Sequence, residues 1–316
     1  MYAGVDLGGT TIACAVASDG GEIVRERSVP TQSNDGPQKV LARISELVSE
    51  LAAGEGKLLA LGMGVPGLLD IRRGRALFLP NFPTQWRDIA VAAELARPLG
   101  CPVHLLNDAR LATLGELTFG HGRTADSMVL FTLGTGVGGG VVIDRKLRLG
   151  ALGAAGEIGH QTVVPDGLRC GCGNRGCLET VASGPALAAE GVRLMRSGLA
   201  PRLHELVGGE ASAVGPKEMA AAAAAGDNNV REAIVRAARY LGIGASNLVT
   251  ALHPQMIVLA GGVAAIGDLL IETVRAGIRE RVRMFPPDDV RVERSMLGDQ
   301  AGVLGGIALA MRGGQV

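Results

Sequence analysis

Apolar residues along this chain occur in two kinds of segment, short continuous runs and longer stretches with helical spacing. Short runs such as 128–133 predict buried strands, whereas apolar residues at helical spacing in 36–51 predict an amphipathic helix. On this basis we expect strands at 2–5, 12–17, 22–29, 58–63, 103–106, 128–133, 141–143 and 256–259. We expect helices at 36–51, 89–96, 109–119, 219–252 with a break near Gly226 and Asp227, 263–281 and 300–311.

One arrangement of strand and turn occurs twice. Residues 5–10 and 130–136 each end a strand in a glycine-rich turn that returns as a second strand. Two copies of one supersecondary unit predict an internally duplicated fold with two β-sheet lobes, and mixed sheets covered by helices belong to the α/β class. We expect a small N-terminal α/β lobe at 1–118, a large α/β lobe at 119–297 and a C-terminal helix at 298–316 that returns to the small lobe.

The composition removes several classes of partner. Lys and Arg together number 31, as do Asp and Glu, and no run of like charge stands out. Nucleic acids and membrane surfaces attract proteins with concentrated positive charge, so we expect neither as a partner. The apolar runs, such as 256–260, are far shorter than the roughly 20 residues that span a bilayer, and the first residues lack the features of a secretory leader. We therefore expect a cytoplasmic protein.

The two glycine-rich turns suit phosphate, because glycine exposes backbone N–H groups without a Cβ. Residues 134–139 match the GxGxxG dinucleotide pattern, but a strand-like segment follows where that pattern requires a helix. No Walker P-loop occurs in the chain. Either turn taken alone could be a tight hairpin, but Asp6 stands at the mouth of the first, where a carboxylate can hold Mg²⁺. Residues 258–263 form a third glycine-containing segment, which suits a nucleotide or a tight strand-to-helix connection.

Three cysteines, Cys170, Cys172 and Cys177, lie close together and follow His160. Three thiolates and one imidazole make a closed tetrahedral zinc set, and the intervening glycines allow a short loop to wrap the ion. The alternative is a group of buried or redox-active thiols. With four protein ligands, the zinc would be structural and would act on chemistry only through the loop that it shapes.

Carboxylates near these features are candidates for acid–base chemistry. Asp108 follows Asn107 where a strand gives way to a helix, so the pair could be a helix N-cap or a functional site. Phosphorylation of a sugar needs one carboxylate to accept the hydroxyl proton, and Asp108 suits that role. Glu157, His160 and Glu179 cluster around the cysteine loop and offer the mixed donors and acceptors that a polyhydroxylated ligand requires.

Together these residues resemble the ROK family of sugar kinases and sugar-responsive repressors, within the actin-like ATPase superfamily. The resemblance rests on Asp6 to Thr10 (DLGGT), Val65-Pro66-Gly67, Pro80-Asn81-Phe82 followed by Trp86, Asn107-Asp108, Leu133 to Gly136 (LGTG), Gly156 to His160 (GEIGH) and Cys170 to Glu179 (CGCGNRGCLE). These motifs run in order along nearly the whole chain. The resemblance implies a two-lobed actin-like (ribonuclease H-like) fold with internal duplication and a zinc loop in the larger lobe.

The resemblance also implies a role for each motif. Asp108 would be the general base on the 6-hydroxyl of a hexose, with glucose favoured. The sugar contacts would be Gly67, Asn81, Asn107, Asp108, Glu157, His160 and Glu179. ATP with Mg²⁺ would be held by Asp6, Gly8, Gly9, Thr10, Thr11, Gly134, Thr135, Gly136, Gly261 and Gly262. His160 would use one ring nitrogen for zinc and the other for the sugar, and the chain would form a homodimer or homotetramer.

Some positions depart from the family pattern. Thr11 stands where many members have Lys, Leu106 where Glu often precedes the Asn-Asp pair, and His253-Pro254 and Ala260 vary the last nucleotide segment.

Three alternatives remain open. N-acetylmannosamine, N-acetylglucosamine, fructose and allose kinases share these motifs, polyphosphate could replace ATP, and the chain could be a non-catalytic sugar sensor like the family's repressors. The repressors carry a DNA-binding module before the first phosphate strand, which here begins at residue 2.

Overall fold

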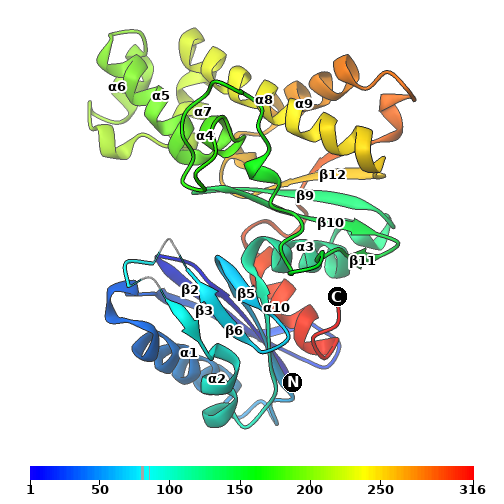
Figure 1. Cartoon of the computed structure of the whole chain (residues 1–316). Coiled ribbons are helices and arrows are strands. Elements are labelled where there is room, and N and C mark those ends of the chain that lie inside the picture. The colour runs from blue at the N-terminus through cyan, green and yellow to red at the C-terminus, as the bar shows by residue number, and fades with distance from the viewer. Residues whose placement is uncertain (80–81, 85) are drawn as a thin grey trace. The chain divides into compact units, whose positions relative to one another are not determined.

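A computed structural model describes residues 1–79, 82–84 and 86–316 of the chain (Figure 1). Its internal contacts divide it into two compact units. Unit 1 comprises residues 1–126, 141–156 and 296–316, and unit 2 comprises residues 127–140 and 157–295. The two units are of similar size, and residues 141–156 belong to unit 1 although the segments on either side of them belong to unit 2. The predicted boundaries near 118 and 297 remain a prediction.

Unit 1 is built on a five-stranded sheet with the order β3-β2-β1-β4-β8. Its strands are β1 (Tyr2–Leu7), β2 (Thr11–Ala17), β3 (Ile23–Pro30), β4 (Ala60–Val65) and β8 (Val103–Asn107). Strand β1 is antiparallel to β2 and parallel to β4, which is in turn parallel to β8. The carboxyl ends of β1, β4 and β8 therefore lie at one edge of the sheet, where polar groups can gather.

A second five-stranded sheet has the order β11-β10-β9-β12-β13. Its strands are β9 (Met128–Leu133), β10 (Val137–Ile143), β11 (Lys146–Leu147), β12 (Met256–Ala260) and β13 (Arg291–Arg294). Strand β12 is parallel to both β9 and β13, as β4 is to β1 and β8 in the first sheet. The repeated order confirms the internal duplication that the two glycine turns predicted.

The helices follow most of the predicted ranges. They are α1 (Pro37–Ala52), α2 (Val91–Leu99), α3 (Asp108–Phe119), α4 (Glu179–Ala182), α5 (Gly184–Arg196), α6 (Pro201–Leu206), α7 (Pro216–Ala224), α8 (Asn228–Leu252), α9 (Asp268–Arg281) and α10 (Ala301–Met311). The predicted break in the long Ala-rich segment is present between α7 and α8. None of the helices in the described part of the chain has the length and apolar character needed to cross a membrane.

Several details differ from the sequence predictions. Helices α4, α5 and α6 and strands β11 and β13 were not predicted. The predicted glycine turn at 134–140 ends at Gly136, because residues 137–140 already pair as part of β10. The segment 263–281 is a short 3-10 turn followed by α9. A small third sheet, with the order β5-β6-β7, was not predicted because its strands are only three or four residues long. These strands are β5 (Leu68–Asp70), β6 (Arg75–Phe78) and β7 (Arg87–Ile89).

The core of unit 1 explains how its sheet is held. Ala3, Val5 and Leu7 of β1 are buried in one apolar cluster with residues of α1. Gly4 points to the other face of the sheet, because side chains alternate along a strand. A Cβ on Gly4 would overlap the backbone oxygen of Val303, so α10 packs directly on the backbone of β1. The C-terminal helix therefore covers the face of the sheet opposite to α1.

Candidate functional site

In unit 1, the acidic side chains meet at the carboxyl end of the parallel strands. Asp6 of β1 pairs in register with Gly64 of β4. A Cβ on Gly64 would lie 3.2 Å from Oδ1 of Asp6 and 3.5 Å from the Cα of Asp108, and a Cβ on Gly302 of α10 would overlap the Asp6 carboxylate. Two glycines thus leave the space that the Asp6 side chain occupies, beside the first residue of α3.

This environment changes the ionisation of Asp6. Burial, followed by the charge of Asp108, raises the pKa of the Asp6 carboxyl from 3.8 to about 7. A cation bound there would offset both effects, because it compensates for lost hydration and screens the second carboxylate. The arrangement therefore fits a site at which Asp6 holds Mg²⁺, directly or through water.

Asn107 and Asp108 fit both interpretations of their motif. The Asn107 side-chain oxygen accepts a hydrogen bond from the backbone N–H of Ala109 (3.2 Å), which makes Asn107 the N-cap of α3. Its Nδ2 donates to the backbone oxygen of Gly67 (3.4 Å), so the cap also joins two predicted sugar-side segments. Asp108 is half-buried and accepts from Ala109 N–H (2.9 Å), at the helix end that favours negative charge. The structural and functional interpretations are compatible.

The first glycine-rich turn, a candidate phosphate site, joins β1 to β2. Gly8 N–H donates to Thr11 O (2.9 Å), and the turn is held from the side by Thr31, whose hydroxyl donates to Gly8 O (2.7 Å). Gly9, Thr10 and Thr11 are exposed, and a Cβ on Gly9 would meet nothing within 4 Å. This turn is therefore an open backbone loop into which a phosphate can approach.

In unit 2, two predicted nucleotide segments lie together. The turn after β9 closes with Gly134 N–H donating to Gly136 O (3.0 Å), and Gly134 O accepts from Gly184 N–H (2.8 Å). Val263 N–H donates to Leu133 O (3.0 Å), which brings the Gly261-Gly262 segment against the end of β9. Two phosphate-binding candidates that are 125 residues apart in the chain thus share the carboxyl edge of β9 and β12.

Glu179 connects this edge to the cysteine loop. Its Oε2 accepts from the backbone N–H of Val137 (3.1 Å), and a Cβ on Gly136 would lie 2.5 Å from the same oxygen. Its Oε1 lies 3.5 Å from Cys170 Sγ. Glu179 therefore supports the second phosphate turn, a role that its position next to the cysteines did not predict.

The four predicted metal ligands converge in unit 2. The ligand atoms of His160, Cys170, Cys172 and Cys177 all lie within 4.8 Å of one another. Cys170 Sγ is 3.6 Å from His160 Nδ1, and Cys172 Sγ is 3.7 Å from Cys177 Sγ. Tetrahedral zinc with Zn–S bonds of about 2.3 Å requires ligand separations of about 3.8 Å, so the donor set fits zinc.

The ionisation of two cysteines in this cluster would depend on a bound metal. Burial raises the pKa of the Cys170 thiol to about 12. The pKa of the Cys177 thiol is also raised, mainly by burial and to a smaller extent by the neighbouring Cys172. Buried thiols of this kind ionise when a metal compensates the charge. Because Nδ1 of His160 faces Cys170, its Nε2 is on the other side of the ring, 3.8 Å from Glu157 Oε2. His160 can therefore bind a metal with one nitrogen and another group with the other.

The structure thus groups the described site residues by unit. Unit 1 carries the predicted residues Asp6, Gly8, Gly9, Thr10, Thr11, Gly67, Asn107 and Asp108, and unit 2 carries Gly134, Thr135, Gly136, Glu157, His160, Glu179, Gly261, Gly262 and the cysteines. Asn81 lies outside the described residues. Gly64 and Gly302 were missed, although both are needed for the Asp6 environment, because a glycine in a strand or helix carries no local sign of what lies against it.

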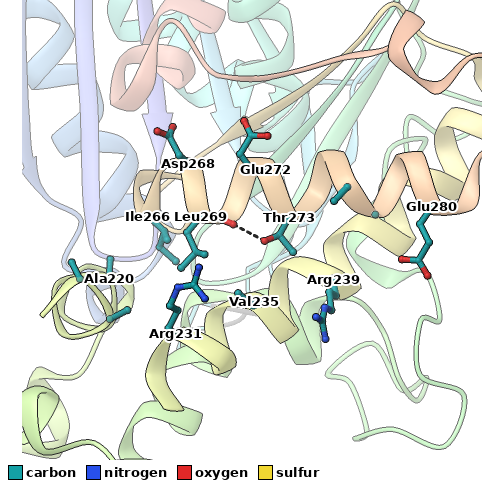
Figure 2. A pocket seen from close by; sticks show the side chains of 14 residues that line it. Ala220, Arg231, Val235, Arg239, Ile266, Asp268, Leu269, Glu272, Thr273 and Glu280 are labelled. Carbon is teal, nitrogen blue, oxygen red and sulfur yellow. Dashed lines mark hydrogen bonds between the residues drawn. The ribbon is translucent and has the colours of Figure 1, made fainter. Parts of the chain in front are cut away.

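A groove of about 790 Å³ opens in unit 2 between α7, α8 and α9. Figure 2 shows Arg231 of α8 pointing toward Leu269 of α9, and Asp268 and Glu272 on the side of α9 that faces away from Arg231. Among the described residues that the sequence predicted for the site, none lines this groove. The groove is therefore distinct from the phosphate turn and the metal ligands of the same unit.

Comparison with known proteins agrees with the geometry. A glucokinase of Halalkalibacterium halodurans is 36% identical over 96% of this chain and 93% of its own length. The crystal structure of a ROK family glucokinase from Streptomyces griseus in complex with glucose and AMPPNP has a TM-score of 0.87 and 34% identity, covering 98% of this chain and 99% of its own. A xylose repressor of Caldicellulosiruptor bescii is 30% identical over 98% of this chain and 77% of its own length.

The resemblance seen in the motifs therefore extends over the whole fold. The ROK family model matches residues 2–312, which include both five-stranded sheets and all four candidate metal ligands. This chain belongs to the ROK family.

Proposed function

We propose that this chain is an ATP-dependent hexose kinase that phosphorylates the 6-hydroxyl of glucose. The observation that carries the proposal is the pairing of Asp6 and Asp108 at the carboxyl ends of parallel strands, next to an open glycine turn. One carboxylate to hold Mg²⁺ and a second to accept a proton are what phosphoryl transfer to a hydroxyl requires. The glucokinase relatives support glucose among the hexoses.

In this proposal Asp108 is the general base. Its carboxylate accepts the proton of the 6-hydroxyl while the sugar oxygen attacks the γ-phosphorus of ATP. The bond between the γ-phosphorus and the β,γ-bridging oxygen breaks, and ADP leaves with the electron pair. Asp108 then releases its proton to water. Asn107 holds the start of α3 through its cap, which keeps the base in one position.

The glycine turns bind the nucleotide in this proposal. Backbone N–H groups of Gly8 to Thr11, Gly134 to Gly136 and Gly261-Gly262 would hold the phosphates. Asp6 would hold Mg²⁺, which neutralises charge on the transferred phosphoryl group when bound. Because the pKa of Asp6 is raised to about 7, a bound cation would favour its ionised form at neutral pH.

The proposal also names the residues that contact the sugar. Gly67, Asn81, Asn107, Glu157, His160 and Glu179 would bind hydroxyl groups, which both donate and accept hydrogen bonds. Zinc on His160, Cys170, Cys172 and Cys177 would hold the imidazole of His160 in one orientation. We also propose that the protein is cytoplasmic and forms a homodimer or homotetramer. Light scattering of the purified protein tests the oligomeric state.

A coupled assay of ADP formation across a panel of hexoses tests the function. We expect glucose to be the best substrate with ATP and Mg²⁺, and Asp108→Asn to lower kcat by about 10²–10⁴-fold while glucose still binds. Asp144→Asn is the matched control, because this carboxylate is exposed and pairs with Arg148. Substantial activity in Asp108→Asn would contradict the assignment of Asp108 as the base. A parallel assay with polyphosphate in place of ATP identifies the phosphate donor.

A sugar sensor is the second candidate, because a xylose repressor is among the relatives. A sensor would bind a sugar in calorimetry and form no ADP with any hexose. The same two measurements therefore separate the two functions.

A further inference from the structure

Arg110 is a charged side chain inside unit 1 that the proposed chemistry does not use. It lies on α3, two residues after Asp108, and only 2% of it is exposed. Its Nε donates to Ala155 O (2.7 Å) and its Nη2 donates to Ala154 O (2.9 Å). A buried guanidinium is costly unless it is hydrogen-bonded, and its planar fork matches two successive carbonyl oxygens with a defined geometry. Arg110 thus ties residues 154–155 to α3.

The tied loop is otherwise mostly at the surface. Leu152 is 81% exposed, and the loop closes on itself through Ala155 N–H, which donates to Leu149 O (2.9 Å). Gly153 lies beside Ile71, which adds one apolar contact. The bonds from Arg110 therefore form a polar link between the end of this loop and a buried helix.

Glu157 follows the tied residues directly. After Ala155, Gly156 turns the chain with φ +97°, and Glu157 is exposed. Ile158 and Gly159 are buried, and a Cβ on Gly159 would overlap Val137 O. Glu157 thus lies between residues 154–155, which are hydrogen-bonded to Arg110, and the closely packed Gly159.

Glu116 provides a comparison on the same helix. It is fully buried and accepts from the backbone N–H of Met296 (3.0 Å) and of His121 (3.2 Å). Met296 begins the segment that re-enters unit 1 and continues into α10. Helix α3 therefore carries two buried charged groups, each tied to a different segment where the chain passes from one unit to the other.

We propose that Arg110 is a positioning residue for Glu157. The inference deepens the proposed function, in which Glu157 binds sugar hydroxyls, and it rests on that function for its kinetic effect. Loss of the two bonds lets residues 154–155 move away from α3, and Glu157 moves with them because only Gly156 separates them. A displacement of about 1 Å in such a group can weaken a productive contact by up to about 100-fold.

Kinetics of Arg110→Met and Arg110→Lys test the proposal. We expect Arg110→Met to raise the KM for glucose about 10- to 100-fold and to leave the KM for ATP within about twofold. Arg110→Lys keeps the positive charge but lacks the planar guanidinium, so its KM for glucose should lie between those of the wild type and Arg110→Met. Glu116→Gln, the control on the same helix, should leave the KM for glucose unchanged. A loss confined to kcat in Arg110→Met would instead mean that Arg110 supports Asp108, and would overturn the proposal.

A double-mutant cycle identifies the residue through which Arg110 acts. If Arg110 works through Glu157, Arg110→Met should change the KM for glucose by less than about threefold in a Glu157→Gln background. Effects that multiply as independent changes would overturn the proposal.

Hydrogen exchange gives a measurement that does not depend on the substrate. Backbone exchange in a peptide covering 150–160 should rise in folded Arg110→Lys and stay unchanged in Glu116→Gln. Unchanged exchange in Arg110→Lys would overturn the proposal. If the wild-type protein phosphorylates no hexose while the exchange rises as expected, the proposed function fails and the anchoring role of Arg110 stands.

Discussion

The two glycine-rich turns arise from the same duplicated unit, yet they are held in different ways. Gly8 to Thr11 form an open loop whose side support is Thr31. Gly134 to Gly136 are packed against Glu179 and bonded to Gly184. Asp6 precedes the first turn, whereas the matching position before the second is Thr132. The duplicated units thus share a backbone arrangement but differ in the carboxylate next to the turn. Asp6 lies in the strand that leads into the first turn, whereas Glu179, beside the second turn, lies at the start of α4.

This difference matters because the two carboxylates have different surroundings. Asp6 belongs to the repeated strand and is enclosed by Gly64 and Gly302. Glu179 begins α4 and lies next to the cysteine cluster. The first turn should therefore respond to changes in charge, and the second to changes in packing and in the metal loop.

Among the changes that probe this contrast, removing a candidate metal ligand should have the largest effect. Cys172→Ser should release zinc and lower kcat/KM for glucose about 10- to 100-fold, because the loop that holds His160 and Glu179 loses its shape. Cys172 is exposed, so the substitution itself costs little packing. Metal analysis and glucose titration measure the two effects, with Cys101→Ser as the control cysteine outside the cluster. Full glucose affinity in protein that contains no zinc would show that metal and sugar are uncoupled.

Adding one methyl group to each turn should distinguish them. Gly136→Ala places a Cβ 2.5 Å from Glu179 Oε2, so this carboxylate must shift and its hydrogen bond from Val137 N–H weakens. We expect kcat/KM for ATP to fall about tenfold. Gly9→Ala meets no protein atom within 4 Å and should leave the thermal stability unchanged, whereas Gly136→Ala should lower it. Equal effects at both positions would contradict the contrast between an open and a packed turn.

The ionisation of Asp6 should appear in the stability of the nucleotide-free protein. Its folded-state pKa of about 7 lies above the unfolded value of 3.8, so its contribution to stability is complete below about pH 4 and is lost as the pH rises through about 7. Asp6→Asn removes this dependence. We expect the variant to gain about 2 kcal/mol, or a few degrees in Tm, relative to the wild type between pH 5 and pH 8. Parallel melting curves across that range would mean that Asp6 does not titrate there.

A new cation in the open turn should have the smallest effect. Thr11 is exposed, and Thr11→Lys would place a positive charge in the open turn. An exposed charge interaction contributes at most about 1 kcal/mol, so we expect the KM for ATP to fall about two- to fivefold. The gain should disappear at high salt, because exposed charges are screened. A gain that persists there would point to a contact other than the charge.

Much of the fold could be predicted from the sequence, because strong apolar runs and helical spacing are local signals. The range 128–133 was predicted as a strand with the bounds that β9 has, and the break between α7 and α8 was predicted from Gly226. Strands β5 to β7 were missed because three or four residues give too little pattern to recognise. The strand character of residues 137–140 was missed because glycine signals a turn when no partner strand is known.

The candidate site divides in the same way. The four metal ligands were predicted from spacing, since three cysteines within eight residues and a nearby histidine are a donor set typical of zinc. The contact of Glu179 with Val137 was not predicted, because the two residues are far apart in the chain. Arg110 was also missed, because an arginine in a helix is usually at the surface and only the packed structure shows it to be buried.

The sequence by itself therefore determined the α/β class, the duplicated strand–turn unit, the candidate metal ligands and the family, because these depend on residue types at short spacing. Only the tertiary structure decided what surrounds each group. The enclosure of Asp6, the support of Gly136 by Glu179 and the anchoring of residues 154–155 by Arg110 all join distant segments. Such contacts arise from packing, which brings together residues that local pattern cannot relate.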